Sequence, residues 1–281
     1  MKIGVCIVFE DMSSMEKKVR RLQEEEFDNC QIISWKPKLW NEENAVLLHD
    51  LFEKYGVKIS AFWCGWEGPC YWNFYEGQKT LGLVPPEYRE RRVKNLCDGA
   101  DFAYKLGIKN VVTHMGYIPE NPYDPEFEPF CNAVRKVANH LKQNKQYLLF
   151  ETGQETPVTM LRCFEEVGCD NLRVNLDTAN LITYGKGNPV DALDVLGEYV
   201  ENLHAKDGLF PTNGHDCGMD VPLGEGKVDF EKLFRKLKEL NYDSYVTIEC
   251  EMAEEESRQQ MLDIYHAREY LKRIIDLVYK N

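Results

Sequence analysis

The chain has 281 residues, of which 43% are apolar and 29% charged, a composition typical of a soluble globular protein with ample material for a core. Acidic residues outnumber basic ones by 47 to 34, which gives a formal net charge of -13. Such an excess of negative charge repels polyphosphates, so the composition argues against a nucleic-acid partner. Length alone leaves open two ordinary domains or one large α/β barrel.

The cysteines and the N-terminus indicate the compartment. Ten cysteines are scattered through apolar segments, and no two of them have C-x-x-C spacing. This pattern is typical of small buried side chains in a reducing environment rather than of disulfides or a zinc finger. The first 14 residues contain a single Lys and a short apolar run that Glu10 interrupts. We therefore expect no signal peptide, no membrane span and a cytoplasmic location.

Along the chain, short apolar segments typical of strands alternate with longer amphipathic segments. We expect eight strands, at residues 2–6, 30–35, 57–63, 109–115, 147–151, 172–177, 200–205 and 244–249. Between the second and third, residues 44–56 repeat leucines with helical spacing and end on Gly56, a typical C-cap. The same pattern predicts helices within residues 97–110, 229–244 and 254–280.

This alternation predicts the fold. Strands separated by helices require right-handed parallel crossovers, and hence a parallel sheet covered by helices. Eight such units favour a (β/α)8 TIM barrel that forms a single domain over residues 1–281. The alternative, a doubly wound open sheet, lacks its glycine-rich phosphate loop after the first strand. We expect residues 85–88 and 119–129 to be long loops of the barrel and not domain boundaries.

Titratable residues end the last four predicted strands. These residues are Glu151, Asp177, His204 and Glu249, and the alternation of each strand lets all four point into the barrel mouth. Three converging carboxylates repel one another, and a divalent cation with one imidazole ligand resolves that conflict. The donor set suits Mn²⁺, Mg²⁺, Co²⁺ or Zn²⁺. A polar residue often ends a strand simply because the strand has reached water, but four on consecutive strands favour a metal site.

Several runs around these residues resemble the sugar phosphate isomerase/epimerase superfamily, the xylose isomerase-like TIM barrel group. That group includes ketose 3-epimerases, hydroxypyruvate isomerases and inosose dehydratases. The runs are FETGQE (150–155), VNLDTANL (174–181), NLHAKDG (202–208), PLGEGKVDF (222–230) and YVTIECE (245–251). The likeness extends in order over nearly the whole chain and is most specific over residues 148–251.

The resemblance implies a function for the four strand-end residues. Glu151, Asp177, His204 and Glu249 match the family's metal ligands, and the two glutamates match its acid/base pair. A metal that chelates two adjacent sugar oxygens acidifies the proton next to the carbonyl and stabilises a cis-enediolate. Returning the proton to the other face of the same carbon gives epimerisation. Returning it to the adjacent carbon, with transfer of the hydroxyl proton as well, gives aldose–ketose isomerisation. The same intermediate can lose a β-hydroxide, so an inosose-type dehydratase is the alternative.

Other residues near the strand ends are candidates for contacts with substrate. His114 ends the fourth strand, Lys206 follows the seventh and suits a substrate oxygen or phosphate, and Gln154 follows Glu151 by three residues. Trp63 and Trp66 could form an apolar wall for a sugar face. For each of the five, a purely structural role is the competing interpretation.

Two positions complicate the assignment. Glu251 has the same parity as Glu249 and competes with it as a ligand, although Glu249 stands where the family's glutamate does. Many epimerase-like members have a His three residues after the aspartate, whereas this chain has Asn180. That difference weakens a specific assignment to the ketose 3-epimerases and leaves the metal site intact.

Two further readings have less support. An endonuclease IV-like enzyme needs more histidines than six for its three zinc ions, and a basic face for DNA. A barrel that binds a sugar without catalysis would be expected to have lost at least one of the four ligands. We therefore expect a small sugar or keto-polyol as the partner, and no membrane partner. The sugar, its phosphorylation and homo-oligomer formation stay open.

Overall fold

The computed structural model describes residues 1–252 and 258–280, and within them eight parallel strands close into a barrel. Around the barrel the strands follow the order β1-β10-β7-β6-β5-β4-β3-β2, so chain neighbours pair throughout. The predicted (β/α)8 fold is confirmed. The barrel strands are β1 (Lys2–Val8), β2 (Asn29–Ser34), β3 (Lys58–Cys64), β4 (Asn110–Thr113), β5 (Tyr147–Glu151), β6 (Leu172–Asp177), β7 (Val200–Ala205) and β10 (Tyr245–Met252).

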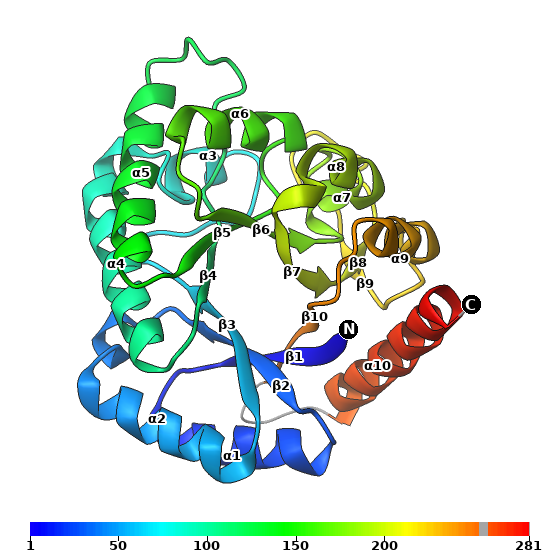
Figure 1. Ribbon diagram of the computed structural model, residues 1–281. Helices are drawn as coiled ribbons and strands as arrows, with labels where there is room; N and C mark the ends of the chain where they lie inside the picture. The colour runs from blue at the N-terminus through cyan, green and yellow to red at the C-terminus, as the bar shows by residue number, and fades with distance from the viewer. Residues whose placement is uncertain (253–257, 281) are drawn as a thin grey trace.

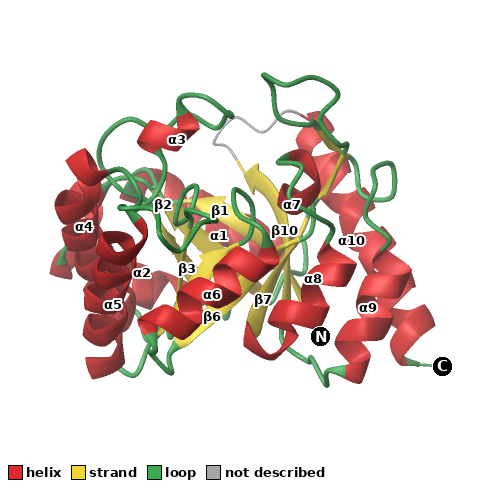
Figure 2. Ribbon diagram, turned by 90° about the horizontal axis from the view of Figure 1, so that it is seen from above, coloured by secondary structure: helices red, strands yellow, loops and turns green. Residues whose placement is uncertain are grey.

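Helices surround the strands, as Figure 1 shows, and Figure 2 shows the yellow strands enclosed between red helices. The longer helices are α1 (Met12–Glu24), α2 (Glu42–Tyr55), α4 (Pro86–Lys105), α5 (Phe127–Gln143), α6 (Pro157–Val167), α8 (Pro189–Leu196), α9 (Phe230–Glu239) and α10 (Arg258–Tyr279). Short helical turns are η1 (Pro37–Leu39), α3 (Gly77–Thr80), α7 (Asn180–Thr183) and η2 (Gly197–Tyr199). Within the described chain, no helix combines the length and the apolar character that crossing a bilayer requires.

Local sequence signals explain where these helices begin and end. At the start of α2, the Asn41 side chain accepts the Asn44 backbone N–H at 2.9 Å, and Gly56 ends the helix in the left-handed region at φ 65°. The prediction of a loop at residues 85–88 is wrong, because α4 begins at Pro86. Proline fits the first turn of a helix, where its missing N–H would have no partner anyway.

Two clusters of apolar side chains hold the barrel together. The larger lies between the strands and the helices, where Phe150 packs edge-on against Phe164 with ring centroids 4.9 Å apart. Truncating a fully buried Phe of this kind to Ala costs about 3–5 kcal/mol. The smaller cluster includes Cys6, Ala61 and Leu149 from β1, β3 and β5. Because Leu149 belongs to this second cluster, Glu151 two residues later shares its face of β5.

The long connections lie at the carboxyl ends of the strands. After β7 the chain forms a small antiparallel pair, β8 (Asp207–Gly208) with β9 (Asp220–Val221), within the predicted enlarged loop. Residues 119–126 form the predicted loop after β4, and α5 takes up the rest of that segment from Phe127. Of the predicted final helix, residues 254–257 lie outside the described part of the chain. The cysteines that the structure describes are free thiols.

Candidate metal centre

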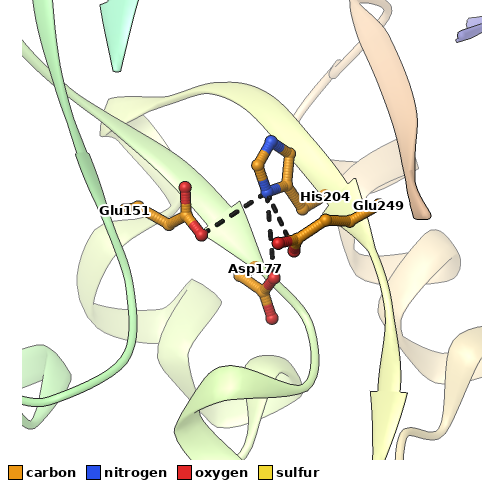
Figure 3. A group of neighbouring side chains, drawn as sticks. All are labelled: Glu151, Asp177, His204 and Glu249. Carbon is orange, nitrogen blue, oxygen red and sulfur yellow. Dashed lines mark ion pairs between the residues drawn. The ribbon is translucent and has the colours of Figure 1, made fainter. Parts of the chain in front are cut away.

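The side chains that end β5, β6, β7 and β10 meet at the mouth of the barrel. His204 Nδ1 lies 3.5 Å from Glu151 Oε1, 3.8 Å from Asp177 Oδ2 and 3.3 Å from Glu249 Oε2 (Figure 3). One ligand atom from each of the four residues lies within 4.8 Å of the other three. Parallel register produces this arrangement, since Asp177 pairs with His204 and His204 with Thr247 across neighbouring strands. The structure thus brings together the four residues that the sequence singled out.

Glu151 is buried and held on both carboxylate oxygens. Trp63 Nε1 donates to Oε2 at 2.5 Å and Asn175 Nδ2 donates to the same oxygen at 3.3 Å. On the other side, Asn180 Nδ2 donates to Oε1 at 3.3 Å and His114 Nε2 lies 3.2 Å from that oxygen. Burial alone would raise the pKa of Glu151, but the charges of His204 and His114 outweigh burial and lower this pKa to about 2. Glu151 is therefore an ionised carboxylate in a fixed orientation.

Asp177 has one oxygen held by the backbone and one free. The N–H groups of Ala179 and Asn180 donate to Oδ1 at 2.8 and 2.7 Å, at the start of the short helix α7. Oδ2 is buried without a hydrogen-bond partner and faces His204. Burial raises the pKa of Asp177 well above its ordinary value, and the negative charges of Glu249 and Glu151 add to this effect. The positive charge of Lys206 lowers the same pKa but does not outweigh them. Within the described residues, the positive charges near the cluster therefore leave the Asp177 carboxylate uncompensated.

His204 is fully buried, with each ring nitrogen in a different environment. Nε2 lies 2.8 Å from the Gln31 carboxamide on β2, whereas Nδ1 has no hydrogen-bond partner and faces the carboxylates. Burial would lower the pKa of His204, but the negative charge of Glu151 outweighs burial and raises this pKa well above its ordinary value. The Gln31 atom nearest His204 Nε2 is Gln31 Nε2, and Gln31 Oε1 accepts from Asn202. A cation at Nδ1 would leave the ring proton on Nε2, so the Gln31 carboxamide would have to turn its oxygen toward the ring to accept that proton.

Glu249 completes the cluster from β10. Besides His204, its Oε2 approaches Lys206 Nζ at 3.5 Å. Burial would raise the pKa of Glu249, but the charges of Lys206 and His204 bring this pKa well below its ordinary value. The competing candidate, Glu251, has a side chain outside the described part of the structure.

The four side chains fit a divalent cation. Asp177 Oδ2, His204 Nδ1 and Glu249 Oε2 are each buried without a hydrogen-bond partner, and all three converge on one point. Bonds of about 2.1 Å to a common ion would place its ligand atoms roughly 3–4 Å apart, which agrees with the His204–carboxylate distances of 3.3–3.8 Å. Three carboxylate oxygens and one imidazole nitrogen form a donor set that Mg²⁺, Mn²⁺ or Zn²⁺ accepts.

A cavity of about 540 Å³ opens in front of the cluster. Five residues that the sequence analysis assigned to the site line it, namely Trp63, His114, Glu151, Lys206 and Glu249. Trp66 and Gln154 do not line it; both are buried, and Trp66 packs against Trp35 with ring centroids 5.2 Å apart. The other lining residues are Ile33, Trp35, Cys70, Trp72, Asn180, Thr183, Tyr184, Cys217, Gly218 and Asp220.

Sequence reasoning missed a buried chain of amides beneath the cluster. Asn202 Nδ2 donates to Gln31 Oε1 at 2.9 Å and to Asn175 Oδ1 at 2.5 Å, and Asn175 in turn donates to Glu151. The chain connects the His204 ring with the Glu151 carboxylate through β2, β7 and β6. A polar residue inside an apolar strand, as in CQIIS (30–34), is the signal that could have indicated Gln31.

The aromatic wall of the cavity was predicted only in part, because Trp35 and Trp72 were not among the predicted residues. Trp72 is 43% exposed and lies 5.0 Å from the His114 ring, and Trp35 packs 4.9 Å from Trp63. Trp35 and Trp72 belong to the aromatic-rich segments SWKPKLW (34–40) and CYWNFY (70–75), and these segments are the sequence signal for the aromatic wall. Arg92 is fully buried and donates to the Gly82 and Pro69 carbonyls, so it anchors the loop that carries Trp72.

A closed barrel with ionisable side chains at the carboxyl ends of its strands defines the class, a (β/α)8 barrel with the layout of an enzyme. Within that class, the chain belongs to the xylose isomerase-like TIM barrel family, whose family model matches residues 19–274. The crystal structure of a xylose isomerase domain protein from Planctomyces limnophilus is 29% identical, covers 99% of each chain and superimposes with a TM-score of 0.90.

Curated relatives whose names describe an activity include epimerases and inosose dehydratases. A putative L-ribulose-5-phosphate 3-epimerase of Escherichia coli is 35% identical over 98 residues, which are 34% of this chain and 33% of that protein. An inosose dehydratase of Clostridium perfringens is 26% identical over 183 residues, or 63% of this chain and 54% of that protein. The matches thus span about a third and about half of the length of these two relatives.

Proposed function

We propose that this protein is a divalent-metal-dependent isomerase or epimerase of a small sugar, sugar phosphate or keto-polyol. One observation carries the proposal: three carboxylates and His204 converge at the barrel mouth, and Asp177 Oδ2, His204 Nδ1 and Glu249 Oε2 are buried there without a hydrogen-bond partner. Membership of the xylose isomerase-like family supports it, as does the relative named as an epimerase. We assign Glu151, Asp177, His204 and Glu249 as the residues that would hold the ion.

When bound, the ion would supply Lewis-acid polarisation of a carbonyl and an adjacent hydroxyl. Glu151 and Glu249 reach the centre from opposite sides, as Figure 3 shows. In the proposed reaction one of them removes the proton next to the substrate carbonyl, which leaves an enediolate, and one of them returns a proton. Return to the same carbon from the other face inverts that carbon, and return to the adjacent carbon exchanges aldose and ketose.

Neighbouring side chains suit this chemistry. Trp63, Asn175 and Asn180 hold the Glu151 carboxylate in one orientation, so its free direction faces the cavity. His114 touches Glu151 Oε1 and lines the cavity, where it can contact a substrate hydroxyl. Lys206, which follows the neighbouring strand β7, balances the charge of Glu249, with Nζ 3.5 Å from Oε2. We assign these residues to orientation and substrate contact, and the two glutamates to proton transfer.

The second candidate is a dehydratase of the inosose type. The same two glutamates would serve it, because loss of a β-hydroxide begins with removal of the same proton. The relative of Clostridium perfringens named as an inosose dehydratase favours this alternative. Product mass separates the two reactions, since an isomer keeps the mass of the substrate and a dehydration product is lighter by one water.

The decisive test uses Glu151→Gln and Glu249→Gln, with Glu165→Gln on the exposed surface of α6 as the control. NMR of candidate ketoses and inososes in D₂O should show deuterium uptake next to the carbonyl with wild type and the control. Each active-site variant should lose at least about a thousandfold in rate while circular dichroism stays native. Near-wild-type turnover by either variant would rule out the acid/base assignment. Metal analysis of the purified protein tests the ion independently of turnover.

A further inference from the structure

The described part of the cavity wall offers no free positive charge to a phosphate. Of the lining residues within residues 1–249 and 261–280, Lys206 alone has an ammonium group, and its Nζ already lies 3.2 Å from Asp220 Oδ2 and 3.5 Å from Glu249 Oε2. Asn180 Oδ1 accepts from the same ammonium at 3.4 Å. A phosphate ester placed beside Lys206 would therefore have to approach two carboxylates, and no arginine is among the lining residues that the structure describes.

The backbone turn that could hold a phosphate is filled by the protein itself. In (β/α)8 barrels the loops after the last two strands often bind phosphate through converging N–H groups. Here the turn after β9 directs such groups at the buried Asp207 carboxylate. The Gly224 and Gly226 N–H groups donate to Oδ2 at 2.9 and 3.0 Å, and those of Gly208 and Val228 donate to Oδ1 at 2.9 and 3.1 Å.

The fit around Asp207 is close. A Cβ at Gly226 would lie 2.1 Å from Asp207 Oδ1, so the glycine is needed for the carboxylate and leaves no room for an additional anion. In phosphate-binding barrels the same kind of glycine lets a ligand oxygen approach the backbone. The glycine-rich PLGEGKV segment (222–228) thus binds an internal carboxylate in the place where related architectures bind an external anion.

The opposite wall of the cavity is aromatic. Trp35, Trp63 and Trp72 line it, and His114 packs between Trp63 and Trp72 with ring centroids 5.8 and 5.0 Å away. Aromatic faces of this kind pack against the C–H surface of a polyol, and the indole and imidazole nitrogens can bond its hydroxyls. Because Trp72 is partly exposed, this wall is accessible from solvent.

From these three features we infer that the substrate is an unphosphorylated, uncharged polyhydroxy carbonyl compound whose C–H face packs on Trp35 and Trp72. This inference rests on the proposed function and narrows it. The carbonyl end lies toward Glu151 and Glu249, and the hydroxyls lie near Lys206, Asn180 and Asp220. Lys206 then orients a carboxylate and a hydroxyl rather than neutralising a phosphate.

A binding experiment with Mg²⁺-loaded wild-type protein tests the inference without turnover. Tryptophan fluorescence follows titration with D-ribulose against D-ribulose 5-phosphate, D-fructose against D-fructose 6-phosphate, and scyllo-inosose. We expect the neutral member of each pair to bind at least about tenfold more tightly, because the two carboxylates beside Lys206 repel the negative charge of the ester. Trp72→Ala should weaken neutral ligands about three- to tenfold, and Tyr71→Ala, whose side chain does not line the cavity, should leave them unchanged.

Inorganic phosphate gives a second measurement. It should not raise the Tm of wild type, whereas in Asp207→Ala, where the four N–H groups lose their carboxylate, millimolar phosphate should raise the Tm. Three results would overturn the inference: tighter binding of either ester than of its neutral partner, stabilisation of wild type by phosphate, or no binding of any neutral probe. If neutral ligands bind selectively but no deuterium exchanges, the proposed reaction fails and the substrate class stands. If only esters exchange, the reaction stands and the substrate class fails.

Discussion

Replacing Glu155 by Gln should stabilise the protein at alkaline pH. Glu155 lies four residues after Glu151 and is only 2% exposed, and neither of its oxygens has a hydrogen-bond partner. Burial raises the pKa of Glu155 from its ordinary value of 4.5 to about 8, and Lys186 and nearby backbone N–H groups offset only part of that effect. Lys186 itself is paired with Glu120 Oε1 at 3.1 Å.

The sign and the magnitude follow from the two pKa values. Between pH 4.5 and about 8 the unfolded chain has lost the Glu155 proton while the folded chain keeps it, so the free energy of unfolding falls as pH rises. Each pH unit in this window is worth about 1.4 kcal/mol, which amounts to about 5 kcal/mol across the window. A neutral glutamine of the same shape removes this loss. Below the window the variant and wild type should differ little.

Urea denaturation of wild type and Glu155→Gln at several pH values between 5 and about 8.5 measures the effect. Chelator in every sample removes any contribution of bound metal, and Glu165→Gln on α6 controls for the loss of an exposed carboxylate. The advantage of Glu155→Gln should grow with pH by up to about 1.4 kcal/mol per unit and level off above pH 8. An advantage that is constant across pH, or a variant that loses stability faster than wild type, would refute the reasoning.

Two further predictions concern the groups that hold the site. Gln31→Leu removes the partner of His204 Nε2 and should weaken metal binding about 10–100-fold, as measured by competition with a chelator. Gln78→Leu on α3 is the control. Unchanged metal affinity of Gln31→Leu would contradict the positioning role of Gln31. Trp63→Phe removes the hydrogen-bond donor to Glu151 Oε2 and should lower kcat/KM about tenfold or more. The control Trp40→Phe loses only a hydrogen bond to Ser34 and should leave kcat/KM unchanged. Equal losses of kcat/KM in the two variants would indicate a general packing effect.

The strands that carry the site were predictable because each is a short apolar run with a definite end. The predicted ranges 147–151, 172–177 and 200–205 match β5, β6 and β7. The fourth strand was predicted too long. β4 ends at Thr113, and the chain turns at Gly116, whose φ of 89° is incompatible with a continuing strand. Two-residue strands such as β8 and β9 have no periodicity from which to predict them.

The residues that hold the site in place could not be predicted from the sequence in the same way. Gln31 and His204 are 173 residues apart, and they touch because both side chains enter the interior of the closed barrel, where only β1 and β10 separate β2 from β7. Strand alternation predicts that both point inward, but it does not determine which inward residues of distant strands meet. The Asp207 turn is similar. PLGEGKV resembles a ligand-binding loop in sequence, and only the packed structure shows a carboxylate of the same chain inside it.

The charge around the cavity connects the proposed metal with the proposed substrate. Glu151, Asp177, Glu249 and Asp220 bring four carboxyl groups to this end of the barrel, and Lys206 is already paired with two of them. Each of these negative groups would attract a compact divalent cation, and that cation would give the buried atoms of Asp177 and His204 the partner that they lack among the described residues. An anionic ester gains from the cation alone and is repelled by the rest of the wall. The arrangement that favours the metal therefore also disfavours phosphorylated substrates, and weakening the negative charge, as in Asp220→Asn, should relax the preference for neutral ligands in the same titrations.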